Sequence, residues 1–307
     1  MLRVEVEAPF DFELSLRFVC QPPRAAAHLG FIPYLDYRQG RQYRRLLALP
    51  SRPILALIAN QGTVDRPRLE VKTIPGDLSA AERDEVRKRV AHIVSAPTGL
   101  AAYYRLAARD PVLRNLAERF HGLKVIRAPS LYECLVSTVL EQQLNFHFAS
   151  TVKRRLLENF GVMIEHEGRV YRGFPPAERL ARLVPTDLRP LQISERKASY
   201  LLGIARAVAA GGMMDHEWSA LPAEVALERL QLLRGVGRWT AEYVLLRGMG
   251  STDALPADDV GLQKSVGALY GLRGPATALA IRRRWRDLAP WRGYATYYTW
   301  FTQWCEV

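Results

Sequence analysis

The sequence predicts an α+β protein in which a small N-terminal antiparallel β-sheet domain precedes an all-α helical bundle. Apolar and polar residues alternate near the start of the chain, whereas from residue 79 onward apolar residues recur at helical spacing. About half of the 307 residues are apolar (49%), which is enough to bury a sizeable core. The length favours two domains. We place them at 1–99, a β-rich domain with a closing helix, and at 100–307, an all-helical region.

Four segments of the first domain are predicted to be strands. Apolar residues alternate with polar ones over 2–8 and again over 12–18, as expected for half-buried strands. A short apolar run covers 54–59, and alternation returns over 69–74. Pro75 and Gly76 then interrupt the pattern, so we expect the sheet to end there.

Helix-capping patterns mark the rest of the chain. Two Ser-x-x-Glu patterns, at 79–82 and 130–133, predict capping boxes at the beginnings of helices. Asn145 is predicted to cap the next helix, which should end near Gly161. Ser194 is predicted to cap a later helix that reaches about residue 210. Helical spacing resumes at Pro222 and continues with breaks to the C-terminus.

The chain carries a net charge of +12, with 43 Lys and Arg against 31 Asp and Glu. Such a balance favours polyanionic partners, since cations placed on phosphates release counterions. Most of the positive charge is arginine, and a G+C-rich genome would raise arginine everywhere. Charge alone therefore leaves nucleic-acid binding open.

The composition argues against a membrane protein and a metalloprotein. No run of roughly 18 uncharged apolar residues is present, and no apolar signal segment follows Met1, so we expect a soluble cytoplasmic protein. Cys20, Cys134 and Cys305 are far apart and odd in number, and the six histidines form no ligand pair. We therefore expect reduced thiols, no disulfide framework and no metal site.

The segment around Gly235-Val236-Gly237 predicts a tight helical hairpin. An apolar helix runs into it and a second helix starts at once. Two glycines around one apolar residue allow a sharp turn whose valine enters the core. The amide N–H groups that begin the second helix would form an anion site suited to a DNA phosphate, flanked by Arg234 and Arg238. An ordinary αα-hairpin with a glycine turn, without any role in DNA binding, fits the same residues.

Two adjacent acids, Asp258 and Asp259, precede a short helical run about twenty residues further on. Helix capping is the simplest interpretation of such a pair. It is compatible with catalysis, because a capped carboxylate is held rigid and charged, as needed to stabilise a developing positive charge.

The glycine hairpin followed by one aspartate resembles the helix-hairpin-helix DNA glycosylases, most closely the bacterial 3-methyladenine DNA glycosylase II branch. Three further segments, Leu135–Gln143, Ile193–Ala198 and Ala289–Ala295, match this family's motifs, and Pro9–Phe18 is similar more weakly. The resemblance covers most of the chain and is strongest from about 128 to 304.

This resemblance implies a monofunctional DNA glycosylase that excises alkylated purines of the 3-methyladenine and 7-methylguanine type. The family's catalytic aspartate stands in an Asp-x-x-Leu pattern, which Asp259 fits and Asp258 misses by one residue. Members that also cleave the strand carry a lysine two residues after the second hairpin glycine. Trp239 stands there, so no lyase activity is expected. The iron–sulfur branch is excluded because its four clustered cysteines are missing.

By the same resemblance, an aromatic pocket would hold the flipped base and a wedge would fill the gap in the DNA. The pocket residues are Trp239, Tyr243, Trp291 and Phe18, which could instead be plain core, since Trp239 and Tyr243 share one helix face. Gln143 occupies the wedge position with Leu144 beside it. Gln143 departs from the aliphatic wedge of close relatives, and a polar helix-terminal residue is its other interpretation.

The expected partner is double-stranded DNA with damaged bases, bound by a monomer that needs no cofactor. Hairpin carbonyls near 233–236 could hold a monovalent cation, which the sequence leaves open. Two other functions remain: a glycosylase for oxidised or deaminated bases, and a non-catalytic DNA-binding protein that uses the hairpin only for phosphate contact.

Overall fold

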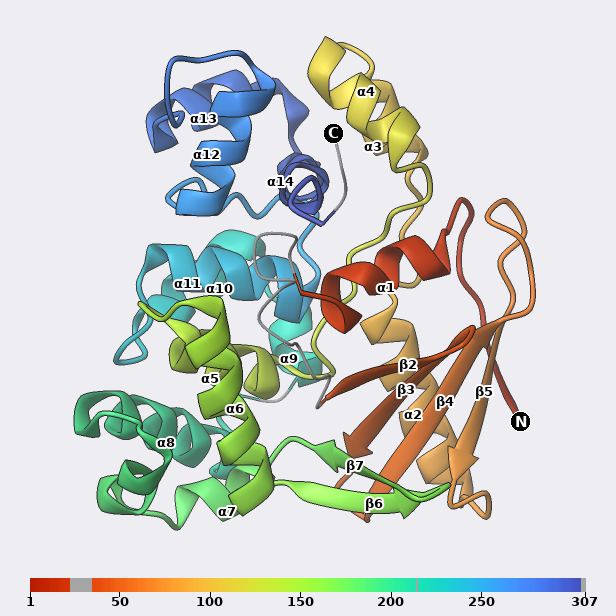
Figure 1. Cartoon of the computed structure of the whole chain (residues 1–307), viewed down its shortest axis with the longest axis vertical. Coiled ribbons are helices and arrows are strands. Elements are labelled where there is room, and N and C mark those ends of the chain that lie inside the picture. The colour runs from red at the N-terminus through yellow and green to blue at the C-terminus, as the bar shows by residue number, and fades with distance from the viewer. Residues whose placement is uncertain (23–34, 214, 305–307) are drawn as a thin grey trace.

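Five antiparallel strands form the N-terminal sheet of the computed structural model, which describes residues 1–22, 35–213 and 215–304. Their order across the sheet is β1-β5-β4-β3-β2 (Figure 1). The strands are β1 (Leu2–Val4), β2 (Asp36–Gln39), β3 (Gln42–Ala48), β4 (Pro53–Asn60) and β5 (Leu69–Ile74). The predicted antiparallel sheet is thus confirmed, including three of the four expected strand segments.

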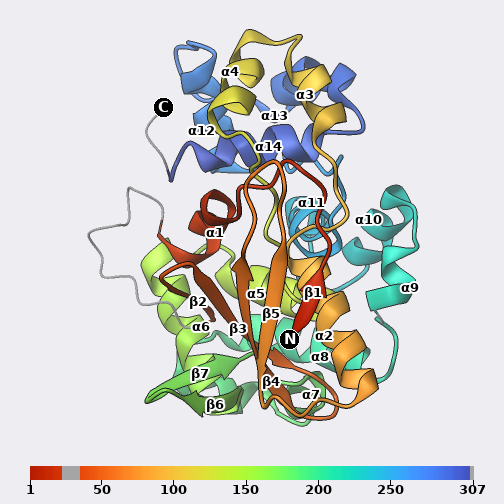
Figure 2. The same cartoon turned by 90° about the vertical axis from the view of Figure 1, so that its right-hand side faces the viewer.

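Both faces of β4 are buried, which explains its continuous apolar run. Ile54 and Ile58 face a core shared with α2 (Ala80–Ile93). Leu55 and Leu57 face the other way and pack against a β-hairpin from later in the chain, β6 (Val162–His166) and β7 (Arg169–Gly173). Figure 2 shows α2 and this hairpin on different sides of the sheet.

The segment 12–18, expected to be a strand, is instead the helix α1 (Phe12–Cys20). Asp11 caps it by accepting the Leu14 N–H at 2.9 Å. The strand-like alternation arises because the helix is covered on two sides. Phe12, Leu16 and Cys20 enter the sheet core, one helical turn apart, whereas Leu14 and Phe18 pack against the helical core. The prediction of a strand from this two-residue alternation was therefore wrong.

The remainder is mostly helical, but β6 and β7 interrupt the region that was expected to be all-helical. Their alternating apolar residues cover the outer face of the N-terminal sheet, a contact that the sequence alone does not reveal. The helices of this region are α3 (Ala101–Ala107), α4 (Pro111–Arg119), α5 (Leu131–Glu141), α6 (Phe146–Phe160), α7 (Ala177–Ala181), α8 (Glu195–Ala209), α9 (Asp215–Ser219), α10 (Ala223–Gln231), α11 (Arg238–Val244), α12 (Val260–Leu269), α13 (Ala278–Arg284) and α14 (Arg292–Phe301). Short 3-10 helices cover Pro185–Leu191 and Arg286–Leu288.

One predicted capping box is complete and the other is not. Ser79 and Glu82 exchange both hydrogen bonds at the beginning of α2. Ser130 caps α5, but the carboxylate of Glu133 does not reach back to it. It pairs instead with Arg45 of β3, which is 1% exposed. A buried guanidinium needs charged partners, so Glu133 joins the helical region to the sheet.

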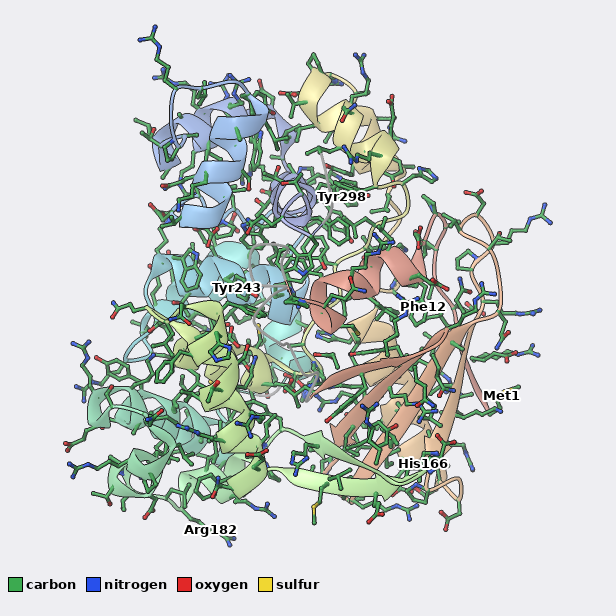
Figure 3. All side chains as sticks on the ribbon, viewed as in Figure 1. Met1, Phe12, His166, Arg182, Tyr243 and Tyr298 are labelled. Atoms are coloured by element: carbon green, nitrogen blue, oxygen red, sulfur yellow. The ribbon has the colours of Figure 1, made fainter. Side chains whose placement is uncertain are left out.

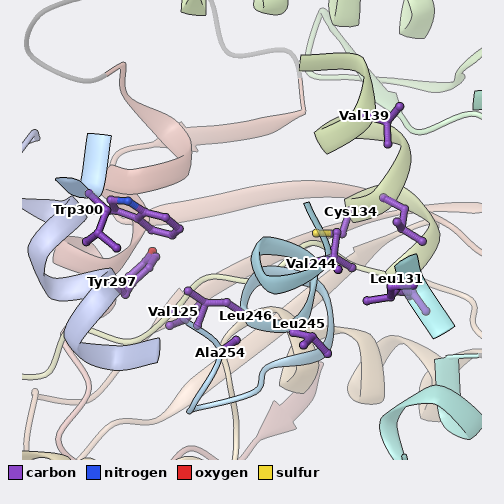
Figure 4. Packing of buried hydrophobic residues seen from close by; sticks show 14 of the residues in the cluster. Val125, Leu131, Cys134, Val139, Val244, Leu245, Leu246, Ala254, Tyr297 and Trp300 are labelled. Carbon is purple, nitrogen blue, oxygen red and sulfur yellow. The ribbon is translucent and has the colours of Figure 1, made fainter. Parts of the chain in front are cut away.

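The helical core centres on α11 and the π-helical turn Leu245–Met249 that continues it. Val244, Leu245 and Leu246 of this segment lie between residues of α5 and residues of α14 (Figure 4). Cys20 and Cys134 are buried free thiols, and Cys305 lies outside the described residues. In the described parts of the chain, no helix is long and apolar enough to cross a membrane.

Candidate active site

Asp259 is held by three hydrogen-bond donors at the N-cap of α12. Its Oδ1 accepts the backbone N–H of Leu262 at 2.7 Å and the indole N–H of Trp300 at 3.0 Å. Its Oδ2 accepts the indole N–H of Trp239 at 3.0 Å. Donors on both oxygens fix the plane of the carboxylate. Asp258 is exposed and lies 3.3 Å from Arg282 of α13, so Asp259 is the acid that the fold orients.

An aromatic row begins at this carboxylate. The ring centroids of Trp239 and Tyr243 are 5.8 Å apart, and those of Tyr243 and Trp300 are 5.6 Å apart. Burial raises the pKa of the Tyr243 phenol, so this ring is a neutral, apolar wall. Tyr243 lies in the centre of the molecule, on α11 (Figure 3). The structure therefore brings the predicted Trp239 and Tyr243 together beside Asp259.

Trp300 is a site residue that sequence reasoning missed, whereas Trp291 was expected in the pocket and does not reach Asp259. Trp291 precedes α14 and Trp300 lies near its end, about 13 Å further along the axis. The Trp291 ring packs instead 5.3 Å from Tyr294 and 6.3 Å from Tyr103. A signal for Trp300 was present, because aromatic residues follow one face of this helix at three- and four-residue spacing.

Phe18 extends the aromatic row from the N-terminal domain. Its ring lies 4.8 Å from Tyr297, one turn before Trp300 on α14, and stacks on Trp304 at 4.4 Å. Phe18, predicted as a pocket residue, thus contacts the Tyr297 and Trp304 rings, at the end of the row remote from Asp259. It can do so only because α1 is a helix that packs against α14.

The glycine hairpin has the predicted form. Gly235 adopts a φ of +86°, which an L side chain rarely takes, and Val236 is 6% exposed within the helical core. Gly237 is the N-cap of α11. Arg234 and Arg238 are exposed on either side of the turn, where they can meet an anion.

The predicted wedge lies in the turn between α5 and α6. Gln143 is exposed with a φ of +59°, and Leu144 is half-buried. Next to them, the Gln142 amide donates to the Gly235 carbonyl at 2.9 Å and to the Thr240 hydroxyl at 2.8 Å. The wedge turn is therefore hydrogen-bonded directly to the hairpin.

Lys197 of α8 holds the same turn from the other side. Its ammonium donates to the carbonyls of Leu140 and Gln142, both at 2.9 Å. Burial and the neighbouring Arg196 lower the pKa of Lys197. The segments that contain Gln142 and Lys197 match family motifs, but the sequence assigned these two residues no role. In the structure both hold the turn in which Gln143 and Leu144 lie.

Together these groups can perform one kind of chemistry. A fixed carboxylate can stabilise positive charge that develops on a sugar, and an aromatic wall can stack on a base. Trp239, at the position where a lysine would allow a covalent imine, directs its N–H to Asp259 instead.

The chain is similar to known repair proteins over most of its length. The family model for "HhH-GPD superfamily base excision DNA repair protein" matches residues 136–290. A DNA-3-methyladenine glycosylase of Bacillus subtilis is 38% identical over 71% of this chain and 72% of its own length.

Two solved structures share the fold. A 3-methyladenine DNA glycosylase from Archaeoglobus fulgidus has a TM-score of 0.82 at 24% identity, covering 99% of this chain and 98% of that one. The Schizosaccharomyces pombe 3-methyladenine DNA glycosylase, solved in complex with abasic DNA, has a TM-score of 0.57 at 26% identity, covering 67% of this chain and 97% of that one. The family match spans the hairpin, the wedge turn and Asp259. The chain therefore belongs to the HhH-GPD superfamily of base excision DNA repair proteins.

Proposed function

We propose that this protein is a monofunctional DNA glycosylase that releases alkylated purines, such as 3-methyladenine and 7-methylguanine, from double-stranded DNA. The observation that carries the proposal is the Asp259 carboxylate, held by the indoles of Trp239 and Trp300 at one end of an aromatic row. Relatives named DNA-3-methyladenine glycosylase support the lesion class. The aromatic faces suit cationic bases, since electron-rich rings attract positive charge.

In this proposal the damaged nucleotide leaves the helix and its base enters the aromatic row, while Gln143 and Leu144 fill the gap. The C1′–N bond breaks and its electron pair leaves with the base, which an alkyl group on the ring already makes a good leaving group. Asp259 stabilises the positive charge left on the sugar. Water then adds to C1′ and loses a proton, which yields the free base and an abasic site. Gly235, Val236, Gly237, Arg234 and Arg238 would bind the DNA backbone.

The reaction requires no cofactor, and a monomer suffices because Asp259, the aromatic row, the hairpin and the wedge all come from one chain. The protein would act on DNA in the cytoplasm. Whether hairpin carbonyls also hold a monovalent cation can be tested by comparing DNA affinity in sodium, potassium and lithium salts at equal ionic strength.

The test is incubation of the purified protein with methylated DNA, followed by detection of free methylpurines and of strand breaks before and after alkali. We expect free base, with breaks only after alkali. Asp259→Asn should abolish release while retaining DNA binding, and Asp258→Asn is its matched control because Asp258 is exposed. Breaks without alkali would refute the monofunctional assignment. DNA binding without base release would favour a non-catalytic protein, and release of oxidised or deaminated bases alone would change the lesion class.

A further inference from the structure

Arg247 is a buried cation at the Phe18 end of the aromatic row. It is 8% exposed, and none of the described residues accepts a hydrogen bond from its Nε or from one of its Nη atoms. No carboxylate forms an ion pair with it in the parts of the chain that the structure describes. An unpaired buried donor is costly, and a charged one more so. Arg45 shows the usual solution, since it is also buried but pairs with both Asp36 and Glu133.

The position of Arg247 follows from the helix that carries Trp239 and Tyr243. Arg247 lies four residues after Tyr243, in the π-helical turn Leu245–Met249, and so continues the same stripe one turn further. Its guanidinium carbon lies 4.5 Å from the ring centre of Phe18 and 5.9 Å from that of Tyr297. Figure 4 shows this turn opposite Tyr297 and Trp300 of α14. Arg247 is thus at the end of the aromatic row opposite Asp259.

We propose that Arg247 is a specificity-determining residue of the base pocket, whose free N–H groups donate a hydrogen bond to an acceptor on the edge of the flipped base. This inference rests on the proposed function. When Asp259 is beside the sugar, the base extends along the row towards Phe18 and Tyr297, and its far edge approaches the guanidinium.

The chemistry of that edge then discriminates between lesions. A 6-oxo purine such as hypoxanthine offers a carbonyl oxygen to the guanidinium. 3-Methyladenine offers an exocyclic amino group at the same ring position, which is itself a donor and cannot accept this hydrogen bond. A site built to form a hydrogen bond discriminates strongly against a base that cannot form it. The fixed positive charge also disfavours a cationic base. Arg247 should therefore raise the release of neutral oxo purines relative to that of 3-methyladenine.

The alternative role for Arg247 is structural, as a cation held on the Phe18 ring that fixes α1 to the helical region. A structural role predicts equal losses for all lesions, whereas the proposed role predicts a change in their ratio. Arg127 provides a matched control. Arg127 is also a largely buried arginine whose Nε has no hydrogen-bond partner among the described residues. It differs in that it donates to the Met249 carbonyl. It also lies away from the aromatic row, because the tyrosine that interacts with it electrostatically is Tyr294, at the other end of α14 from Trp300.

The experiment measures single-turnover release of hypoxanthine from a duplex oligonucleotide and of 3-methyladenine from methylated DNA, by the wild type, Arg247→Met and Arg127→Met. We expect Arg247→Met to reduce hypoxanthine release about 30-fold or more relative to 3-methyladenine release, as expected for the loss of one hydrogen bond from a charged donor, while Arg127→Met leaves the ratio unchanged. Arg247→Lys, which keeps the charge but not the planar fork, should give an intermediate ratio and provides the measurement if the methionine variant does not fold.

Three outcomes would overturn the inference. The wild type could release 3-methyladenine but no hypoxanthine, the Arg247 variants could lower both rates equally, or Arg127→Met could shift the ratio by as much as Arg247→Met. Each leaves the proposed glycosylase activity intact. A wild-type protein that releases neither base refutes the proposed lesion class itself, and Arg247 then has no base to select.

Discussion

Replacing Gly235 by alanine should destabilise the protein, because this position meets two separate penalties. The φ of Gly235 is +86°, and an L residue in the left-handed region costs about 1–2 kcal/mol. An added Cβ would also lie 2.3 Å from the ring of Tyr200, and forcing an atom into a packed site costs about 1–3 kcal/mol. We therefore expect Gly235→Ala to lower the free energy of unfolding by about 2–5 kcal/mol.

Thermal unfolding followed by circular dichroism checks this expectation. At about 2 °C per kcal/mol, the value for the larger domains, the melting temperature should fall by about 4–10 °C. Gly237→Ala is the matched control. Gly237 does not have a positive φ, and its added Cβ would meet no atom within 4 Å, so the change should stay within about 0.5 kcal/mol. Equal melting temperatures for the two variants would refute the reasoning about the hairpin.

The Gly237→Ala protein also tests the anion site, since it should fold normally. Its methyl group would project into open space at the beginning of α11, where the proposed function places a DNA phosphate. We expect weaker binding to duplex DNA with unchanged stability. Unchanged affinity would show that the phosphate does not approach this glycine.

Three further predictions concern the carboxylate, the buried ion pair and a buried lysine. Trp300→Phe keeps a ring but removes one N–H donor to Asp259. Since a hydrogen bond to a charged group contributes about 1.5–3 kcal/mol, single-turnover base release should slow about 10- to 100-fold. An unchanged rate would show that Trp300 does not position Asp259. Arg45→Met leaves the buried Glu133 carboxylate without its ion-pair partner. The free energy of unfolding, measured with urea, should fall by about 3–5 kcal/mol. A decrease below about 1 kcal/mol would contradict the importance of this ion pair. Burial lowers the pKa of Lys124 to about 8 from 10.5, so between these pH values only the unfolded chain holds the proton, and this lysine's contribution to stability rises with pH. The stability of Lys124→Met relative to the wild type should therefore be greatest below pH 8 and decline towards pH 10, and a difference independent of pH would contradict this assignment.

The hairpin glycines and the helix-capping aspartate could be located from the sequence because each depends on local structure. Gly235 and Gly237 are demanded by the turn itself, and Asp259 caps the helix that follows it in the chain. The helix caps at Ser79, Asn145 and Ser194 could be predicted from the sequence for the same reason. Each of these features involves residues within a few positions of one another, so spacing and residue type specify them.

Long-range contacts decided the rest. The alternation over 12–18 fits a strand equally well, and only the second core against which Phe18 packs makes the segment a helix. Trp291 and Trp300 are both plausible pocket residues in sequence, but in the folded chain it is the indole of Trp300 that donates to Asp259. Glu133 turns from its own helix to Arg45 because a buried charge on a distant strand requires it. The unpaired guanidinium of Arg247 is likewise a property of the packed molecule. Local patterns in the sequence were therefore enough to identify the family, the hairpin and the capped aspartate. Long-range packing determines which aromatic rings lie beside Asp259 and that the Arg247 guanidinium is buried near Phe18.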